Sequence, residues 1–333
     1  MRKLLTQGIT LLALLGGVST YAATPDPATD LNAAQQAFIN ELVSEHNFDR
    51  DEVAGLLAQA ELNQAVLDAI QRPWEAKPWH QYYPIFLTEK RLAAGLKFWQ
   101  KHADSLGKAE QQFGVPAEVI VAIIGVETFY GGYLGNYKVL DALYTLGFHY
   151  PPRQSFFRSE LKEFLLLARD EQLAATELKG SYAGAMGYGQ FISSSYRHYA
   201  VDFDGDGVRD LLNNPVDAIG SVANYFVRNG WRPNAPVAIE LPATPANAEL
   251  ASDGLKLTAT VGQLTAAGLE LPPEHAELAA DLDAKVFRFE QPDGADYWLG
   301  LHNFYVITRY NRSPLYAMVV HQFSQQLAAA RKE

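Results

Sequence analysis

Residues 114–132 read GVPAEVIVAIIGVETFYGG, and this stretch decides the fold. Pro116 lies where the first turn of a helix begins, a position that proline favours. From Val119 to Val126 the chain is apolar at every position, glycine included. A helix that is apolar on all sides is buried at the centre of a domain. We therefore predict a central helix from Ala117 to about Thr128.

Helical spacing of apolar residues continues on both sides of this stretch. It predicts helices over residues 53–60, 65–71, 88–113, 139–146, 156–171, 216–228 and 315–332. Residues 236–301 differ, because 255–260 and 285–289 alternate with period two between turns rich in Gly, Pro and Asp. The sequence thus predicts a mainly α (α+β) protein in which a small β-rich insertion precedes the closing helix.

Composition excludes several classes of protein. The chain has 333 residues, of which 48% are hydrophobic and 20% charged, enough for a packed core and about two domains. Its net charge of −11 argues against nucleic acid as a partner, because phosphates demand a basic face. The absence of cysteine excludes disulfides, thiolate metal sites, a cysteine nucleophile and a lipid anchor on an N-terminal cysteine.

The first residues are typical of an export signal. Arg2 and Lys3 precede an apolar run from Ile9 to Val18, and small residues follow as far as Ala23. The run is too short for a membrane-spanning helix, which needs about 20 apolar residues. We predict that residues 1–22 are a cleaved signal peptide and that the mature chain is a soluble, acidic, exported protein.

Glu127 is a candidate general acid. It ends the most apolar helix and is followed at once by aromatic residues and glycines. We expect its carboxyl to be half-buried at the wall of a cleft, where desolvation raises the pKa and keeps the acid protonated. The alternative is an ordinary glutamate at a helix end, paired with a nearby arginine or lysine.

Two further segments combine aromatic and polar residues. Residues 179–191, KGSYAGAMGYGQF, contain glycines dense enough for a ligand to approach the backbone closely. The segment lacks the lysine and spacing of a phosphate loop, and a helix-packing loop is the alternative. Residues 303–311, NFYVITRYN, combine tyrosines with asparagines as carbohydrate sites do, although an amphipathic strand with a helix cap would look the same.

Residues 202–210, DFDGDGVRD, match the start of an EF-hand calcium loop. Carboxylates stand at loop positions one, three and five (Asp202, Asp204, Asp206), glycine stands at six, and Val208 would add its backbone carbonyl. Position twelve is Asn213 in place of the usual glutamate, so Asn213, Asp210 or the more distant Asp217 would complete the site. A solvated acidic turn is the alternative.

Together these segments resemble the lytic murein transglycosylase B family. The resemblance runs in order from about Gln35 to near the C-terminus, through 114–128, 139–143, 179–191, 202–207, 215–226 and 304–311. It implies a lysozyme-like helical core with an EF-hand-like calcium loop and a small β domain. The implied division is a signal peptide (1–22), an N-terminal helical domain (24–113), a catalytic core (114–235) with a calcium loop (202–217), a β-rich domain (236–301) and a segment returning to the helical domain (302–333).

The resemblance also implies an activity, cleavage of the β-1,4 bond between N-acetylmuramic acid and N-acetylglucosamine in peptidoglycan, with Glu127 as the single catalytic acid. Its implied partners are peptidoglycan glycan strands and other cell-wall enzymes. The matching substrate-contacting positions are Tyr82, Ser181, Gln190, Tyr225, Tyr310, Asn311 and Tyr316, with Arg153 for a carboxylate of the substrate. The chain departs from the family in having Pro152-Arg153 where paired arginines can occur. Since many members are lipoproteins and this chain has no cysteine, the expected location is the soluble periplasm.

A single acid points to a non-hydrolytic route. Glycosidases that use water generally need two carboxylates beside the bond. In the transglycosylase route the C6 hydroxyl of the muramic acid attacks its own anomeric carbon and leaves a 1,6-anhydro end. The alternatives are a hydrolytic muramidase, with Asp141 or Glu160 as second acid, and a non-catalytic, calcium-stabilised wall-binding protein.

Overall fold

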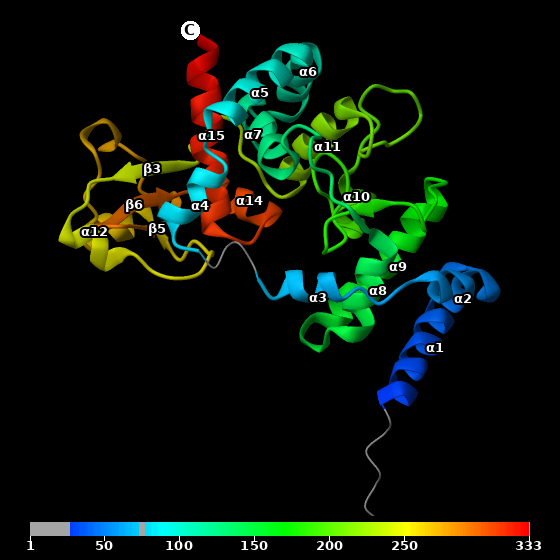
Figure 1. The fold of residues 1–333 in the computed structure, drawn as a ribbon. Coiled ribbons are helices and arrows are strands. Elements are labelled where there is room, and N and C mark those ends of the chain that lie inside the picture. The colour runs from blue at the N-terminus through cyan, green and yellow to red at the C-terminus, as the bar shows by residue number, and fades with distance from the viewer. Residues whose placement is uncertain (1–26, 73–76, 333) are drawn as a thin grey trace, which may run out of the picture.

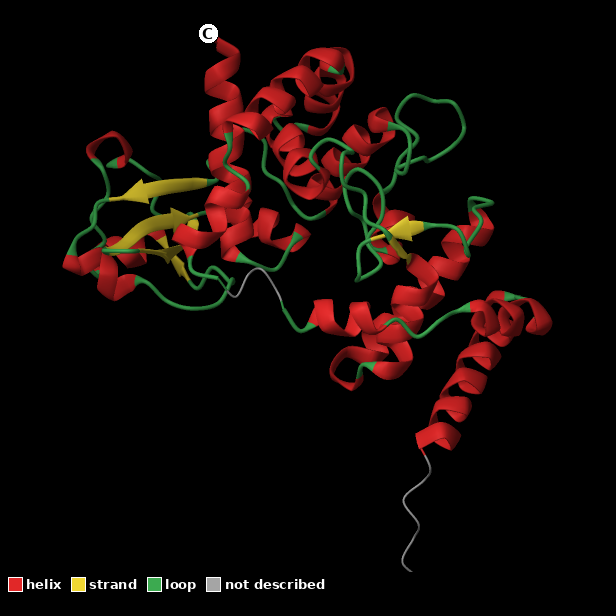
Figure 2. Cartoon of the chain, viewed as in Figure 1, coloured by secondary structure: helices red, strands yellow, loops and turns green. Residues whose placement is uncertain are grey.

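The computed structural model describes residues 27–72 and 77–332, so the predicted signal peptide lies outside the described residues. The described chain is mostly helical, with a four-stranded sheet and a two-stranded ribbon (Figures 1 and 2). The α-helices are α1 (Pro27–His46), α2 (Arg50–Gln59), α3 (Gln64–Ile70), α4 (Trp79–Tyr82), α5 (Glu89–Lys101), α6 (Ala103–Phe113), α7 (Ala117–Thr128), α8 (Val139–His149), α9 (Gln154–Asp170), α10 (Ser193–Tyr199), α11 (Pro215–Arg228), α12 (Pro245–Leu250), α13 (Val261–Ala266), α14 (His302–Tyr310) and α15 (Pro314–Lys332).

Helix α7 lies at the centre of the larger core, as predicted. Nearly all of its residues are buried, and α5, α6, α11 and α15 pack around it (Figure 1). Its start is set by Gly114, which ends α6 at φ +66°, and by Pro116, which takes the N-cap position. The continuous apolar run is therefore explained by contact with other helices on every side.

The single helix predicted over residues 88–113 is wrong, because the chain breaks at His102 into α5 and α6. His102 has φ −115° and ψ 27°, outside the helical region, and its ring packs 4.6 Å from that of Phe98. The break re-aims the chain so that α6 packs on α11 while α5 packs on α15. Tertiary packing thus overrides a helical pattern that continues across the break.

Helices α8 and α9 form a hairpin through the short 3-10 helix η3 (Pro151–Arg153), and they pack tightly on each other. The N-terminal helices α1 and α3 contact this hairpin at the edge of the molecule (Figure 1). One tie is the side-chain amide of Gln35, which donates to the Tyr144 hydroxyl at 2.8 Å. Strands β1 (Tyr137–Lys138) and β2 (Lys179–Gly180) pair antiparallel, and β1 contacts α8 of this hairpin.

The β-rich segment contains one antiparallel sheet of order β3-β6-β5-β4. Its strands are β3 (Ala238–Leu241), β4 (Ala259–Thr260), β5 (Asp283–Gln291) and β6 (Gly294–Gly300). One face carries a second, smaller core: Ile239, Leu241, Val261, Leu264, Leu269, Ala284, Val286, Leu299 and Leu301. The other face presents Phe287 and Phe289 to the larger core, where Phe289 lies 5.2 Å from Trp79 of α4. The sheet is therefore covered on both faces.

Two expectations need correction in this part of the chain. Of the alternating stretch 255–260, only Ala259 and Thr260 form a strand. The turn just before the stretch holds the ammonium of Lys285, which donates to the Ser252 hydroxyl and the Asp253 carbonyl. The possible strand at 303–311 is a helix, α14, since Phe304 and Ile307 are buried one turn apart. The prediction of a mainly helical protein with a small β-rich insertion is confirmed.

Helix α15 closes the molecule by packing along α7 and α5. It begins after Ser313, whose hydroxyl accepts the amide hydrogen of Tyr316 at 3.3 Å. Among the described helices, none alone is long and apolar enough to cross a membrane. The pair α6 and α7, bent by 117°, meets that test only when the two are combined.

Candidate active site

Glu127 lies in the last turn of α7, half-buried, where the helix stops abruptly. The next two residues, Phe129 and Tyr130, have φ of 51° and 60°, a left-handed conformation that costs non-glycine residues free energy. Thr128 holds the reversal in place: its hydroxyl lies 2.9 Å from the Tyr188 carbonyl and accepts the amide hydrogen of Gly131 at 3.0 Å. The local sequence thus places a carboxyl at a fixed, partly open helix end.

Tyr316 of α15 is the direct partner of Glu127. Its hydroxyl donates to Glu127 Oε1 at 2.5 Å, across 189 positions of sequence. Burial, followed by the nearby charge of Glu127, raises the pKa of Tyr316 well above its usual value. The phenol therefore keeps its proton and remains a hydrogen-bond donor to the carboxyl.

Tyr310 and Tyr225 stand beside this pair. The Tyr310 ring stacks 6.4 Å from that of Tyr316, and it meets the Tyr225 ring edge-on at 4.7 Å. The Tyr310 hydroxyl donates to the Gly189 carbonyl at 2.6 Å, and the Tyr225 hydroxyl donates to the Arg309 carbonyl at 2.5 Å. Their hydroxyl protons are thus used within the protein, and the rings form a wall that joins α11, α14 and α15 to the glycine-rich segment.

Ser181 and Gln190 shape that segment from within. The Ser181 hydroxyl accepts the amide hydrogens of Ala183 and Ala185 at 3.2 and 3.0 Å. Gln190, at φ 49°, donates from its side-chain amide to the Leu134 and Gly187 carbonyls. Gly187 has φ +70°, and a side chain there would begin 2.1 Å from the Leu211 carbonyl oxygen. The glycines thus permit backbone to approach backbone in a loop that folds tightly.

The remaining predicted contacts fall in three places. Tyr82, at the end of α4, is buried with its ring 5.1 Å from that of Phe86. Asn311 is the half-buried C-cap of α14, directly after Tyr310. Arg153 is exposed in η3, and its guanidinium lies over the ring of Phe156 at 4.3 Å. The structure therefore brings Tyr225, Tyr310 and Tyr316 together beside Glu127. Tyr82 packs on Phe86, and Arg153 packs on Phe156 of α9.

The two candidate second acids are engaged in structural hydrogen bonds. Asp141 accepts the amide hydrogen of Glu61 at 3.0 Å and so fixes the segment between α2 and α3 to α8. Glu160 accepts the amide and hydroxyl hydrogens of Ser194 at 3.0 and 2.7 Å, at the start of α10. Burial raises the pKa of Glu160. Each carboxyl therefore joins two segments of backbone.

The acidic loop brings together three of its predicted ligands. Oxygens of Asp202, Asp204 and Asp217 lie within 4.8 Å of one another, with Asp217 buried. Backbone hydrogen bonds, above all from Gly207, lower the pKa of Asp202, whereas desolvation raises that of Asp217. Asp206 instead accepts the amide hydrogen of Val208 at 2.8 Å. Several carboxylate oxygens at this spacing fit a hard cation such as Ca²⁺.

Of the three residues considered for closing the loop, Asp217 is the one that joins the cluster. The side chain of Asn213 points to Asp210, donating to its carboxylate at 3.2 Å. Asp210 in turn accepts the amide hydrogens of Leu212 and Asn213, both at 2.9 Å. The loop therefore extends past position twelve into the first turn of α11.

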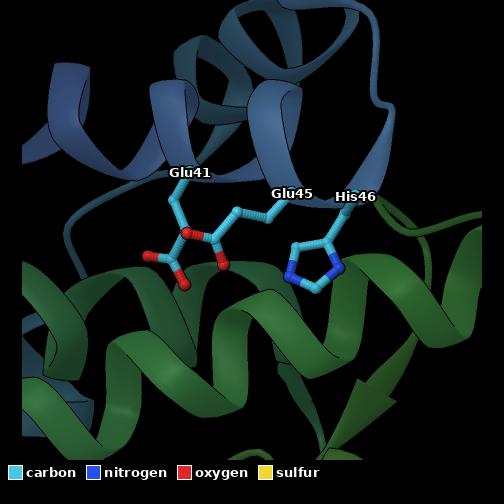
Figure 3. Close-up of side chains that lie close together, drawn as sticks. All are labelled: Glu41, Glu45 and His46. Atoms are coloured by element: carbon cyan, nitrogen blue, oxygen red, sulfur yellow. The ribbon is translucent and has the colours of Figure 1, made fainter.

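A second group able to hold a metal lies at the end of α1, where Glu41, Glu45 and His46 face α9 (Figure 3). Glu41 already accepts the ammonium of Lys162 at 2.6 Å. A cavity of about 300 Å³ adjoins it, lined also by Ser155 and Arg158. This cavity lacks the pairing of a carboxyl with a tyrosine hydroxyl that distinguishes Glu127.

Comparison with known proteins assigns the family. The model of the transglycosylase SLT domain matches residues 30–325. Membrane-bound lytic murein transglycosylase B of Escherichia coli is 45% identical over 90% of this chain and 84% of that protein. The chain belongs to the transglycosylase SLT domain family.

Solved structures agree with this assignment. Soluble lytic transglycosylase SltB1 from Pseudomonas aeruginosa is 47% identical over 90% of this chain and 100% of its own, with a TM-score of 0.84. Escherichia coli lytic transglycosylase Slt35 in complex with calcium is 43% identical over 93% of this chain and 100% of its own, with a TM-score of 0.82. The predicted fold class and the predicted enzyme class, lytic transglycosylase, are confirmed.

Two residues beside Glu127 are not among the candidates drawn from the sequence. Thr128 follows the acid directly, and a hydroxyl at a helix end is a signal for such an anchor. Arg91 lies in α5, 36 positions earlier, and donates to the Gly125 carbonyl at 3.1 Å. Its place depends on how α5 packs against α7, which no local pattern encodes.

Proposed function

We propose that this SLT-family enzyme cleaves the β-1,4 bond between N-acetylmuramic acid and N-acetylglucosamine in peptidoglycan without adding water. The observation that carries the proposal is Glu127, a half-buried carboxyl bonded by the Tyr316 hydroxyl at 2.5 Å. The name of the E. coli relative, a murein transglycosylase, supports peptidoglycan as the substrate. The structural hydrogen bonds of Asp141 and Glu160 favour this route over a two-acid hydrolase.

Glu127 acts first as an acid and then as a base. Its proton goes to the oxygen that leaves with the N-acetylglucosamine, and the bond from that oxygen to C1 of the muramic acid breaks. The C6 hydroxyl of the same muramic acid then attacks C1, and its proton returns to Glu127. The product carries a 1,6-anhydro end, and the enzyme ends in its starting protonation state.

The residues around Glu127 hold the sugar in place. We propose that Tyr82, Tyr225, Tyr310 and Tyr316 form the aromatic wall against which sugar rings lie. Ser181 keeps one hydroxyl proton for the glycan while accepting two backbone amide hydrogens. Gln190 and Asn311 contribute amide groups, and exposed Arg153 binds a carboxylate of the muramyl or peptide part of the substrate.

We propose that the loop over residues 202–217 binds a structural Ca²⁺ ion. Asp202, Asp204 and Asp217 would supply carboxylate oxygens, and Asp206 and the Val208 carbonyl would complete the set. A calcium complex is known for Slt35, which is 43% identical to this chain. The ion would hold the start of α11 against the loop, and no chemical step passes through it.

We further propose that the protein acts in the periplasm, where the predicted signal peptide would deliver it and where it would meet glycan strands and other cell-wall enzymes. The units 24–113, 114–235, 236–301 and 302–333 remain our proposed domain division. The separate small core of the sheet supports the unit over residues 236–301.

Mass spectrometry of digested peptidoglycan tests the reaction. The muropeptides released should be lighter than hydrolysed ones by the mass of one water molecule, and no new reducing end should form. In oxygen-18 water they should carry no label. The C6 hydroxyl is tethered to the carbon it attacks, and intramolecularity is worth roughly 7–11 kcal/mol in well-oriented cases, so water should compete poorly.

Label at the muramic C1 would overturn the proposal and identify a hydrolytic muramidase. No release of muropeptides at all, with glycan binding intact, would identify a wall-binding protein.

A further inference from the structure

Arg91 joins three segments next to Glu127. From the first turn of α5 its guanidinium donates to the Gly125 carbonyl in the last turns of α7 at 3.1 Å. Its Nη1 donates to the Ile85 and Phe86 carbonyls, each at 2.8 Å. These two residues end the segment that begins with Tyr82. One planar cation thus ties the helix that carries the acid to the segment that carries a wall tyrosine.

The same guanidinium lies against the aromatic residue that follows α7. It is 5.3 Å from the ring centre of Phe129 and 5.2 Å from that of Phe86. Arginine suits this place because its donors are fixed in a fork and its flat face stacks on rings, neither of which lysine offers. A cation beside the last carbonyls of a helix is also favoured by the helix dipole.

The chain after Glu127 needs such support. Phe129 and Tyr130 are both left-handed, a conformation that costs non-glycine residues free energy. The Tyr130 ring stacks 5.1 Å from that of Phe98, and its oxygen fits where Gly95 and Gly125 have no side chain, since a Cβ on either would lie 2.4 Å from it. Arg91 and Tyr130 therefore hold the reversal from two sides.

We propose that Arg91 is a positioning residue for Glu127, which locks the end of α7 at a fixed distance from the Tyr82 segment. The inference rests on the proposed role of Glu127 as the acid. Arg91 touches neither the substrate nor a reacting atom in this scheme. It acts by keeping the carboxyl and the aromatic wall in one geometry, so its loss should affect turnover more than glycan binding.

The test compares Arg91→Met, which keeps the apolar stem, with Arg91→Lys, which keeps the charge but not the fork. The control is Arg169→Met, because Arg169 also donates to a carbonyl, that of His46, and lies 4.6 Å from a ring, that of Phe48, but does so on α9. We expect kcat on peptidoglycan to fall roughly ten- to a hundredfold in both Arg91 variants, with KM little changed. Arg169→Met should leave kcat unchanged.

A chemical rescue separates positioning from simple loss of stability. Guanidinium chloride at low, non-denaturing concentration should restore part of the kcat of Arg91→Ala but add nothing to Arg169→Ala. All variants are assayed well below their melting temperatures. Wild-type kcat in Arg91→Met, an equal loss in Arg169→Met, or no rescue of Arg91→Ala would each overturn the proposal.

Hydrogen exchange tests, without an activity assay, whether Arg91 clamps the chain reversal after Glu127. In Arg91→Met the amide hydrogens of Phe129 and Tyr130, which bond to Gly125 and Ile124, should exchange faster. The amide hydrogen of Asn229, at the end of α11, should not change. Unchanged exchange at Phe129 and Tyr130 contradicts the clamp itself. If exchange is faster in Arg91→Met but the separate variant Glu127→Gln keeps full activity, the clamp exists and the proposed role of Glu127 is wrong.

Discussion

Replacement by glutamine should reduce activity but not stability at Glu127, and stability but not activity at Glu160. Glu127→Gln keeps the oxygen that accepts from Tyr316 but removes the transferable proton. We expect activity to fall by about 10²–10⁴-fold, the usual range for a general acid, with an unchanged melting temperature. Muropeptide release and thermal unfolding are the measurements, and more than about a tenth of wild-type activity would show that another residue is the acid.

Glu160→Gln is the matched variant. Glu160 accepts two hydrogens from Ser194, and an amide there has only one acceptor oxygen. We expect the free energy of unfolding to fall by about 1–3 kcal/mol. At a temperature where it is folded, the variant should retain wild-type turnover. A large loss of turnover in the folded variant would favour the two-acid hydrolase.

Tyr130 carries a hydroxyl that the described residues leave without a hydrogen-bond partner. Burial also raises its pKa, so the group stays neutral. Because an unpaired buried polar group costs about 1–3 kcal/mol, Tyr130→Phe should stabilise the protein in urea unfolding. Tyr196→Phe is the control and should destabilise it, since the Tyr196 hydroxyl donates to the Arg209 carbonyl and accepts from the Leu211 amide. Equal effects of the two changes would contradict this account.

Among the elements, the acidic loop between α10 and α11 should respond to calcium. An ion that binds the folded state alone raises the melting temperature by mass action. We expect Ca²⁺ to do so after chelator treatment and Mg²⁺ to do so far less, because Mg²⁺ demands a smaller, more regular site. Asp204→Asn should abolish the effect, whereas Asp281→Asn, an exposed acid in the β-rich segment, should leave it. An unchanged melting curve with Ca²⁺ would contradict the site.

The local sequence pattern predicts a helix well where the apolar residues of the pattern are the residues that the helix buries. The apolar run of α7 and the spacing of α11 and α15 are enough to place these helices within a few residues. The break at His102 is invisible to such a pattern, because both α5 and α6 read as helix and only their different packing partners separate them. The strand alternation at 255–258 also fails, because only Ala259 and Thr260 pair with β5.

The site is harder to derive than its elements. Glu127, the glycine-rich segment and the acidic loop each carry a local signal, but nothing in their spacing states that they meet. Tyr316 reaches Glu127 across 189 positions, and Arg91 reaches Gly125 across 34. The family resemblance selected Tyr316, because it transfers a residue by position. It left Arg91 aside, because a residue that acts through the backbone has no signature of its own.

At the scale of the whole molecule, stability should depend on pH through His321 of α15. This side chain is buried 5.7 Å from the ring of Trp298, and burial lowers its pKa to about 4. Well above pH 6.5 it is neutral in both states and has no effect. Between pH 6.5 and 4 the unfolded chain takes up a proton that the folded chain does not. The free energy of unfolding therefore falls by about 1.4 kcal/mol for each unit by which the pH is lowered.

His321→Leu should therefore reduce this slope in urea unfolding between pH 6.5 and 4. It should not abolish it, because burial also lowers the pKa of His102 and His149, which add slopes of the same sign. Above pH 7 the difference in stability between variant and wild type should be constant. An identical slope in the two proteins would show that His321 titrates alike in the folded and unfolded states.

The hydrogen bond between Tyr316 and Glu127 also makes the site depend on nearly the full length of the chain. The acid belongs to the middle of the chain, whereas its phenol partner belongs to the last described helix. A chain that ends before α15 therefore holds the carboxyl without its donor and lacks the helix that packs along α7. We therefore expect the site to be complete only when the whole described chain has folded, and a copy truncated before α15 to leave the wall polymer uncut.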